Sequence, residues 1–547
     1  MIFSQKVDFR QPPERDILHF QGKIYSHPAP SPLDIIRNPA SLNHIEADAA
    51  IVHYDREKKR WRLLRDFGQT PLYYAPVPNG FIWSFTLTGL LEHLDNPRPD
   101  EATMFDYLAT HYRYIFRDPS RTFHEGVFQV PAGSLIDIDE RGGLTANRWL
   151  DLSPEPELYR LGPEEATERL MEILRESVRL RVRAARRPAF TVSSGLDSST
   201  VASLASEYVD EMRVFSVGYS GEGVEEFDET EGVAELVRGR GWQWTHLMLD
   251  CPDLITEAGN LISLTQSPIT TVTWLAYYLM AKQLQGFSEL FNGLGGDESL
   301  AGEFVHFFYF FADLKAEGLD DRLAAEVEGW SRLHDHPVFK KNAQVLEDFW
   351  QRNIDFQTGD MRVDQKVYQA NWRFFNPDWL AVYGPKAPPM PRPYPNYLSN
   401  RLFQEIRFET TPPTLWGMFM ANQVLGLTGV SPFMSTRLFK LCLALPGTVK
   451  YDHGLTKALL RRGLKGVLPE SLRLNHKKTG FNAPIHQWFN NSKVSRPLLE
   501  LLNNGPIAKM GWLKPGAAEQ ILKEHETGQA NHMMLLWPLL NASLFLK

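Results

Sequence analysis

The sequence is poor in cysteine, since Cys251 and Cys442 are the only two among 547 residues. They are too few and too far apart in the chain to form a disulfide framework or a cysteine-based zinc site. Two buried thiols in a reducing compartment are the simplest interpretation. The sequence therefore excludes small disulfide-stabilised domains and zinc-finger proteins.

Long hydrophobic runs are also missing. The most apolar stretch, FVHFFYFFA at 304–312, is far shorter than the roughly 20 residues that cross a bilayer. The first 20 residues carry charges throughout and contain no apolar segment of the signal-peptide type. We therefore expect a cytoplasmic protein without a membrane partner.

Positive charge is not in excess, because 58 Lys and Arg stand against 66 Asp and Glu, a formal net charge of -8. Binding to nucleic acid needs a concentrated basic face, so a nucleic acid is not expected as the main partner. The chain is longer than one hydrophobic core usually supports, which predicts two domains.

Strand-like segments separated by turn residues fill residues 16–150, which predicts a mostly antiparallel β-rich layer. The proline-containing segment SPEPELYRLGPEEA at 153–166 interrupts this pattern and is the expected linker. We therefore assign one domain to residues 1–155 and a second domain to residues 160–547.

The second domain begins with the pattern of a parallel α/β sheet. A helical pattern at 164–182 is followed by the strand AFTVS at 189–193, a serine-rich turn, a helix near 199–208 and the strand MRVFSVGY at 212–219. This order of strand, turn, helix and strand is typical of a parallel sheet covered by helices. A later strand leads to a glycine-rich turn at 293–296.

The region from 303 to 400 is polar and aromatic, and its topology is left open. The aromatic run at 304–311 favours a buried helix over an apolar substrate pocket. The two histidines of RLHDHP at 332–337 favour a surface turn over a metal site, because no third ligand is evident.

The stretch SSGLDSS at 193–199 places four hydroxyls, one glycine and one carboxylate between a strand and a helix, without a lysine. Backbone N–H groups and the helix dipole at such a turn attract an anion, and small residues let phosphate oxygens approach closely. The Gly-Lys-Ser/Thr signature of the common nucleotide triphosphatases is missing. The turn therefore predicts a different kind of phosphate-binding loop.

Asp197 in this loop would repel a phosphate unless a cation lay between them, which makes it a candidate Mg²⁺ ligand. Magnesium is usually held by one or two carboxylates together with substrate phosphates. Asp297, in GLGGDES after another strand, is expected at the same carboxyl edge of the sheet, where open α/β sheets bind ligands. Each motif by itself is equally explained as a helix cap or a turn, but the two together favour a site.

Together these motifs resemble the asparagine synthetase family. The resemblance spans about 165–490 and rests on a series in the family's order: VSSGLDSST, VFSVGY, FDETEGVAEL, GLGGDESLAG, SPFMS, ALPGTVK and TKALLRRGLKGVLPESLRLNHKKTGFNAPIHQWF. Relatives with this signature include asparagine synthetases, β-lactam and carbapenam synthetases and lasso-peptide cyclases.

The resemblance implies an α/β fold in which a truncated, Ntn-hydrolase-like β-rich domain precedes a pyrophosphate-loop ATPase domain with a parallel sheet and many helices. It also implies ATP and Mg²⁺. A substrate carboxylate would attack the α-phosphate of ATP and release pyrophosphate, and an amine would then displace AMP to form an amide.

The resemblance also assigns roles to individual residues. Lys478 in KKTGF takes the position of the family's lysine that faces the phosphates and the intermediate, and Lys457 in TKALLRR is a second candidate. Glu298, Glu303 and His306 are candidate bases for the amine, by proximity in the sequence. The implied ATP contacts are Ser193, Ser194, Gly195, Leu196, Asp197, Ser198, Ser199, Phe215, Ser216, Val217, Gly293, Leu294 and Gly295, with Asp197 and Asp297 as the metal ligands.

The N-terminal region departs from the family's amidotransferase pattern. The family's catalytic cysteine follows the initiator methionine, whereas here the second residue is Ile2 and no cysteine lies in the first 150 residues. Ser4 has no terminal amine beside it that could act as its base. FQGKIYSH at 20–27, RDFGQTPLYY and TFHEGVFQVPAGSLI resemble the remaining elements. We therefore expect an inactive amidotransferase domain that does not hydrolyse glutamine.

The synthetase region departs from the family where it would handle the acyl substrate. Leu294 stands where asparagine synthetases have a glutamate and β-lactam synthetases a tyrosine, and Thr428, Val430 and Ser435 replace charged residues of a family element. Ser194 stands where the loop usually has a second glycine. A site without these charges would select poorly for aspartate, so we expect a different substrate.

The sequence therefore predicts an ATP-dependent amide-bond-forming ligase of specialised or peptide natural-product metabolism. Its substrates would be a small-molecule or peptide carboxylate and an amine. An ammonia-dependent asparagine synthetase and a pseudoenzyme scaffold that partners another synthetase remain alternatives. Intramolecular cyclisation, a homodimer and a biosynthetic partner protein are left open.

Overall fold

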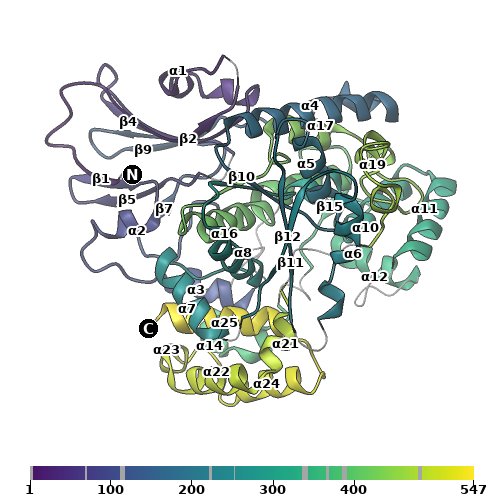
Figure 1. Ribbon diagram of the computed structural model, residues 1–547. Helices are drawn as coiled ribbons and strands as arrows, with labels where there is room; N and C mark the ends of the chain where they lie inside the picture. Colours follow the sequence, from purple (N-terminus) through teal and green to yellow (C-terminus); the bar gives the residue numbers. More distant parts are fainter. Residues whose placement is uncertain are drawn as a thin grey trace.

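The computed structural model describes residues 4–26, 28–67, 70–110, 118–220, 224–251, 253–334, 343–364, 369–384, 391–477 and 483–547. A β-rich N-terminal region lies at the upper left of Figure 1, and a larger α/β region follows it. The α/β fold class predicted from the sequence is confirmed.

The N-terminal region contains two antiparallel sheets, where the sequence predicted one layer. The first sheet has the strand order β1 (Ser4–Asp8), β6 (Gly80–Ser84), β5 (Tyr73–Val77) and β7 (Phe128–Gln129). The second has the order β2 (Ile17–Ile24), β3 (Ala47–Asp55), β4 (Arg60–Arg65), β8 (Ser134–Asp139) and β9 (Leu144–Arg148). Both sheets contribute to one buried aromatic cluster, with Tyr54 and Trp61 from one sheet and Phe81 and Trp83 from the other. Strand β1 was not predicted, because its sequence SQKVD has a single apolar residue.

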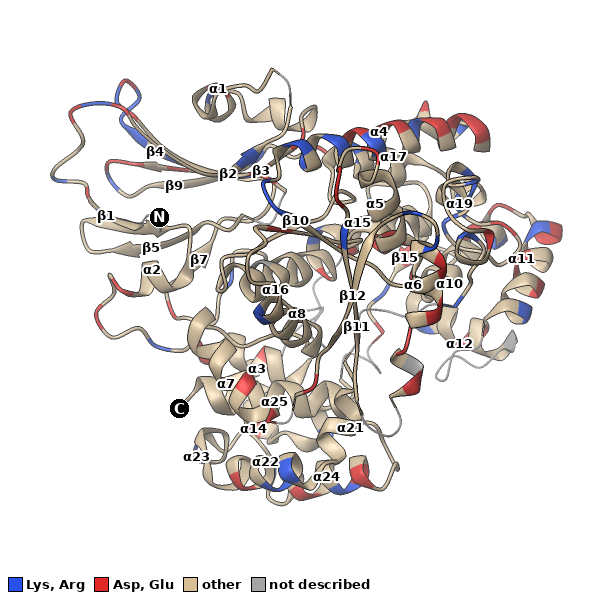
Figure 2. Ribbon diagram, in the orientation of Figure 1, with Lys and Arg blue, Asp and Glu red and all other residues tan. Residues whose placement is uncertain are grey.

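The α/β region is built around one five-stranded sheet in which every neighbouring pair is parallel. The strand order is β12 (Gln243–Met248), β11 (Arg213–Gly218), β10 (Pro188–Thr191), β13 (Glu289–Phe291) and β16 (Thr428–Val430). The strands predicted at 189–193 and 212–219 correspond to β10 and β11. Figure 2 shows that β11 and β12 carry almost no charge; β11 is mostly buried, whereas β12 is the edge strand and has several exposed residues.

Helices cover both faces of this sheet. Phe190 and Phe291 pack on one face with α4 (Pro163–Ala184), α5 (Leu196–Ala205), α6 (Thr230–Val237), α17 (Thr436–Ala444) and α19 (Ala458–Gly463). Ala189 and Leu290 pack on the other with α7 (Leu254–Thr265), α8 (Val272–Gln283), α16 (Thr411–Gln423) and α25 (Met533–Phe545). The predicted helix near 199–208 in fact begins at Leu196, which places Asp197 in its first turn, where a carboxylate interacts favourably with the helix dipole.

The region whose topology the sequence left open forms a helical layer. It contains α10 (His306–Ala316), α11 (Asp320–Leu333), α12 (Ala343–Asn353) and α15 (Tyr397–Phe408). The aromatic run of α10 is buried in a cluster that also includes residues of the N-terminal region, so the prediction of a buried helix is confirmed. His334 bonds Gly454 O through Nε2 at 2.7 Å, whereas His336 lies outside the described residues.

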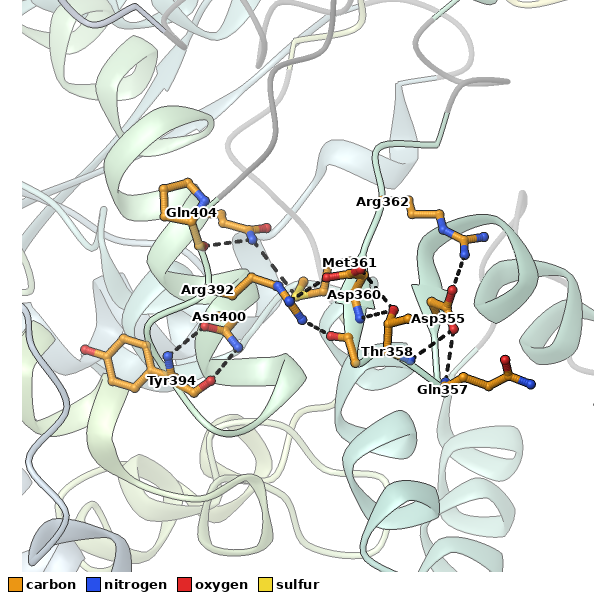
Figure 3. Close-up of polar contacts among 12 residues, drawn as sticks. Asp355, Gln357, Thr358, Asp360, Met361, Arg362, Arg392, Tyr394, Asn400 and Gln404 are labelled. Carbon is orange, nitrogen blue, oxygen red and sulfur yellow. Dashed lines mark hydrogen bonds and ion pairs between the residues drawn. The ribbon is translucent and has the colours of Figure 1, made fainter.

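A short hairpin, β14 (Ile354–Asp355) and β15 (Asp360–Met361), lies beside the start of α15. Figure 3 shows the polar contacts that join them. Arg392 pairs with Asp360 at 2.5 Å, and the Gln404 side chain donates to Pro391 O at 3.2 Å. These contacts hold α15 against the segment that precedes it.

The N-terminal and α/β regions share packing and polar contacts. Helix α3 (Glu101–Ala109) lies in the same hydrophobic cluster as α25, and the Tyr107 hydroxyl donates to Ile269 O at 2.6 Å. Arg181 of α4 donates to Glu46 at 2.8 Å, and both side chains are almost fully buried. Within the described part of the chain, no helix has the length and apolar character needed to cross a membrane.

Candidate active site

The serine-rich turn connects β10 to α5 and is held by its own hydroxyls. Ser193 and Ser198 bring their hydroxyl oxygens to 2.7 Å, and the Ser193 hydroxyl accepts the N–H of Gly195 at 3.1 Å. The Ser199 hydroxyl is buried and donates to Ser193 O at 2.8 Å. The loop is therefore preformed, with Gly195 and Leu196 at the N-terminal end of α5.

Lys457 joins the two predicted metal ligands. Its Nζ lies 2.5 Å from Oδ2 of Asp197 and 2.6 Å from Oδ1 of Asp297, so these two oxygens are no more than about 5 Å apart. The lysine is only 6% exposed. Its backbone has a φ of 56° at the start of α19, a left-handed conformation that bulky residues seldom adopt. The structure thus brings both aspartates and the second candidate lysine together.

Glycines permit the close approach of the chain segments that form this cluster. A Cβ on Gly296 would lie 2.4 Å from Cγ of Asp197, and a Cβ on Gly293 would lie 2.5 Å from the backbone nitrogen of Ser198. A Cβ on Gly302 would meet Asp297 and Lys457 at 2.0 and 2.3 Å. The GLGGDESLAG motif therefore brings the Asp297 turn against the serine-rich turn.

Two residues near this cluster were not identified from the sequence. Burial lowers the pKa of Arg461 to about 10, while the negative charge of Asp197 favours its charged form. Glu229 accepts a hydrogen bond from the Ser194 hydroxyl at 2.7 Å, which gives the serine at the usual glycine position a partner. Arg461 lies in the TKALLRR motif and Glu229 in the FDETE motif. Neither motif by itself shows which of its residues faces the serine-rich turn.

The remaining predicted ATP contacts lie on β11 and in the glycine-rich turn. Phe215 and Ser216 are buried, and the Ser216 hydroxyl accepts from Trp244 Nε1 at 2.8 Å and bonds His246 Nδ1 at 2.9 Å. The Ser216 side chain is therefore engaged, and the backbone of Phe215, Ser216 and Val217 pairs with β12, so their role as ATP contacts stays a prediction. Gly295 has a φ of 94°, and Leu294 packs partly into the hydrophobic core.

The candidate bases differ in their surroundings. Glu298 is buried in the first turn of α9 (Gly296–Leu300), directly after Asp297. His306 is fully enclosed, and its Nδ1 accepts the backbone N–H of Glu303 at 3.2 Å while Nε2 lies 2.7 Å from Glu405. An accepting Nδ1 requires the proton on Nε2, so His306 donates to Glu405. This arrangement engages both ring nitrogens and does not support His306 as the base for an amine.

The lysine ranked first from the sequence, Lys478, lies outside the described residues, and its role stays a prediction. Neighbouring Lys477 is exposed. Burial raises the pKa of both Cys251 and Cys442 to about 12, so neither thiol ionises readily at neutral pH.

The chemistry of the cluster fits a Mg²⁺ ion. Asp197 and Asp297 already share one cation, the Lys457 ammonium, so both carboxylates can reach a common positive charge. Among the residues that the structure describes, no group of three or more His, Cys, Asp or Glu forms a self-sufficient metal site. Magnesium does not need one, because substrate phosphates and water complete its coordination.

Comparison with known proteins agrees with this arrangement. A family model described as asparagine synthase matches residues 169–547, and one described as glutamine amidotransferase domain matches residues 39–150. The chain is 22% identical over 506 residues to asparagine synthetase [glutamine-hydrolyzing] 1 of Bacillus subtilis, covering 87% of this chain and 73% of that protein. It is 24% identical over 377 residues to amidase chry2 of Gibberella zeae, covering 63% of this chain and 53% of that protein.

A shorter match has higher identity. The chain is 35% identical over 119 residues to carboxyethyl-arginine beta-lactam-synthase of Streptomyces clavuligerus, covering 21% of this chain and 22% of that protein. The asparagine synthase model spans well over half of the sequence and includes Asp197, Asp297 and Lys457. This chain therefore belongs to the asparagine synthase family.

Proposed function

We propose that the protein is an ATP-dependent amide-bond-forming ligase, a carbon–nitrogen ligase that adenylates a substrate carboxylate and joins it to an amine. The products of the first half-reaction are an acyl-adenylate and pyrophosphate, and the amine then releases AMP. The observation that carries the proposal is the bridge that Lys457 makes between Asp197 and Asp297, next to the serine-rich turn. A scaffold has no need of a buried cluster of this kind.

The chain's own groups supply the electrostatics of pyrophosphate release. The turn at 193–199 presents the N-terminal end of α5, where backbone N–H groups favour an anion. Lys457 and Arg461 add positive charge beside Asp197. Such preorganised charges stabilise the transition state without reorganisation at the moment of reaction. Bound Mg²⁺, held by Asp197 and Asp297, would supply further neutralisation of phosphate charge.

The acyl substrate in this proposal is not free aspartate. Leu294 offers no charge and packs partly into the core. Its neighbour Asn292 is buried and accepts the Ser431 hydroxyl at 2.6 Å, so this part of the site is neutral as well. A neutral site cannot select an amino acid with two extra charges. A carboxylate of peptide or specialised natural-product metabolism, joined without glutamine hydrolysis, suits this site better, and the match to a beta-lactam synthase supports that role.

The decisive experiment measures pyrophosphate release from ATP and Mg²⁺ with a panel of carboxylates, including aspartate with ammonium, amino acids and short peptides. We expect release with at least one carboxylate and none with glutamine as the nitrogen source. Asp197→Asn and Asp297→Asn should each lower the rate about one hundred- to one thousandfold, because one lost electrostatic contact of this kind is worth about 3 to 4 kcal/mol.

Asp210→Asn, on an exposed carboxylate in the described residues, is the matched control and should retain the parent rate. Turnover of aspartate with ammonium would support the alternative of an asparagine synthetase. No release with any carboxylate, together with unchanged ATP binding in both active-site variants, would favour the scaffold alternative and refute the proposed enzyme.

A further inference from the structure

A small cavity lies between the N-terminal and α/β regions, away from the candidate ATP site. Its volume is about 20 Å³, and its polar lining comes from Arg65 and Gln129 on one side and Arg407 and Thr411 on the other. Arg65 ends β4, whereas Arg407 is in the last turn of α15 and Thr411 is the first residue of α16. None of the residues of the serine-rich turn or the Asp297 turn lines it.

Arg407 brings a buried charge to this cavity that its neighbours do not neutralise. It is 7% exposed, and its Nη1 is buried without a hydrogen-bond partner among the described residues. The nearby carboxylates of α15 and its end bind elsewhere, since Arg401 pairs with both Glu405 and Glu409 at 2.7 Å. Burial, with a smaller contribution from the charge of Arg148, lowers the pKa of Arg407 to about 9, so the guanidinium is still charged at neutral pH.

Arg65 is in a similar position across the cavity. It is 5% exposed, and its Nη1 donates to the neutral oxygens of Val130, at 3.2 Å, and Gln129, at 3.5 Å. Its Nε is buried without a hydrogen-bond partner in the described part of the chain. The hydroxyl of Thr411 is buried and likewise unpartnered among the described residues. Hydrogen-bond donors of Arg65, Arg407 and Thr411 that have no partner among the described residues therefore belong to the lining of one cavity. The N-terminal end of α16, which carries the positive end of the helix dipole, also borders the cavity.

Neither guanidinium forms an ion pair within the described part of the chain, although the charges of Asp66 and Asp48 act on Arg65 and favour its charged form. Such burial is costly, because a buried charge needs a compensating charge or hydrogen bonds. An arginine side chain keeps its proton at neutral pH, so it cannot avoid the free-energy cost of burial by becoming neutral. An ordered water can bond the N–H groups of both arginines, but an anion between them supplies both hydrogen bonds and compensating charge. A carboxylate is an anion whose flat, two-oxygen geometry matches a guanidinium fork.

The surrounding structure fixes these groups in place. Asp313 of α10 accepts the backbone N–H groups of Tyr397 and Leu398 at the start of α15. Further along the same helix, Asn400 bonds Tyr394 and Gln404 bonds Pro391 (Figure 3). Helix α15 is therefore anchored along its length, and the position of Arg407 at its end is set before any ligand binds.

We propose that this cavity is a carboxylate-binding site in which Arg65 and Arg407 hold the two oxygens of a small carboxylate, with Thr411 donating a further hydrogen bond. The carboxylate can be a free metabolite or the terminal group of a larger ligand whose remainder lies outside the cavity. The site is separate from the proposed adenylation chemistry and does not depend on it.

The test is thermal unfolding and calorimetric titration of the full chain with sodium acetate, at constant ionic strength set by a bulky sulfonate salt. Acetate should bind saturably and raise the unfolding midpoint of the parent. Arg407→Met should bind acetate at least about tenfold more weakly, since hydrogen bonds to charged groups are lost. Without acetate, its midpoint should equal or exceed that of the parent, because the substitution removes a buried unpaired charge.

Thr411→Val keeps the shape of the side chain and serves as a second variant if Arg407→Met does not fold; its acetate affinity should fall several-fold. Arg238→Met, on an exposed arginine, is the control and should respond like the parent. Equal acetate effects in the parent, Arg407→Met and Thr411→Val would overturn the site, as would no saturable binding to the parent. Repeating the titration with acetate and with longer monocarboxylates separates the sources, because a terminal group of a larger ligand gains affinity with chain length and a free small carboxylate does not.

Discussion

The buried charges of the N-terminal region and those of the synthetase site are arranged in opposite ways. In the N-terminal region, Glu46 is locked between Arg181, at 2.8 Å, and the hydroxyl of Ser435, at 2.5 Å, and all three are buried. At the edge of the parallel sheet, Lys457 meets two carboxylates that are each still partly exposed. The first arrangement is closed and connects two regions of the chain. The second is accessible to a ligand.

This difference suggests separate roles for the two regions: support for the N-terminal region and chemistry for the synthetase region. The amidotransferase-like region has two sheets and buried polar contacts to α4 and to the start of α17. The synthetase region contains the charged cluster, and uncharged residues stand at positions 294, 428 and 430, where the resemblance to the family implied polar or charged ones. The expected role of the N-terminal region is therefore support, and substitutions of Glu46 and Ser4 test this role against a catalytic one.

The largest effect should come from removing the lysine of the accessible cluster. Lys457→Met should lower the rate of pyrophosphate release at least a hundredfold while ATP binding changes little, because its charge counts most when negative charge develops on the leaving group. The measurements are pyrophosphate release and equilibrium ATP binding. Lys465→Met, on an exposed lysine that follows α19, is the control and should keep the parent rate.

The same assays with Lys478→Ala and Lys477→Ala distinguish the two candidate lysines. If both Lys457 and Lys478 act on the phosphates, each loss is large and Lys477→Ala is neutral. A normal rate in Lys457→Met would show that its bridge between the aspartates is structural, like the Glu46 cluster.

Substitutions in the closed cluster of Glu46, Arg181 and Ser435 should change the free energy of unfolding and leave the rate of pyrophosphate release unchanged. Glu46→Ala leaves Arg181 buried without its carboxylate, which typically costs about 3 to 5 kcal/mol in the free energy of unfolding. The double variant Glu46→Ala with Arg181→Met should recover much of this loss, because no unpaired charge remains. Urea unfolding measures both, and pyrophosphate release per folded molecule should stay at the parent level.

Glu207→Ala is the matched control, because Glu207 pairs with Arg175 at 2.7 Å on the surface. Exposed pairs contribute roughly 0 to 1 kcal/mol, so little change is expected. A loss of turnover in Glu46→Ala at unchanged stability would mean that the N-terminal region takes part in the chemistry after all.

The residues of the candidate site that follow a strand could be predicted from local sequence patterns. The serine-rich turn, Asp197 and Asp297 each follow a strand, and the parallel order of β10 and β13 places both acids at one edge of the sheet. The central place of Lys457 was not predictable in this way, because it approaches Asp197 across 260 residues of sequence. A lysine in a helix-like segment has no local signal that distinguishes a buried bridge from a solvated surface group.

For the fold as well, elements with a local sequence pattern were predicted and elements that depend on tertiary contacts were not. Strands with continuous apolar residues, such as β10 and β11, were found, whereas β1 was missed because pairing with β6 rather than its own residues makes it a strand. The contacts of Glu46 with Arg181 and Ser435 join positions 135 and 389 residues apart. Such tertiary contacts leave no periodic pattern in the sequence, so only the structure shows how the two regions hold together.

A smaller, pH-dependent effect should come from Asp313, which lies in the helical layer next to both regions. Burial raises its pKa to about 7, against the lowering effect of the N–H groups of Tyr397 and Leu398. A carboxyl with a raised pKa stabilises the fold fully below its unfolded pKa near 4, and this contribution is lost as the pH rises through about 7. Asp313→Asn does not ionise, and its single carbonyl oxygen keeps an acceptor for one of the two N–H groups, which bond different oxygens of Asp313.

The difference in stability between variant and parent should therefore shift in favour of the variant by up to about 4 kcal/mol from pH 4 to pH 8. Unfolding in urea at a series of pH values gives this difference directly. A difference that is constant from pH 4 to 8 would show that Asp313 does not titrate in this range.

The smallest effect should be found where the family has its glutaminase nucleophile. Ser4 is the nearest hydroxyl to the N-terminus in the described residues, and its Oγ lies 2.9 Å from Nε2 of His93. This pair lies at an exposed edge, on a strand whose partner is β6, and a serine is activated only when an oriented base and an oxyanion site act together. Ser4→Ala should leave pyrophosphate release unchanged, and both the parent and the variant should release no ammonia from glutamine above the rate without protein. Ammonia release by the parent that persists after a thiol-directed inhibitor and disappears in Ser4→Ala would show that the N-terminal region has kept a catalytic nucleophile, and the contrast between a supporting region and a reacting region would then be lost.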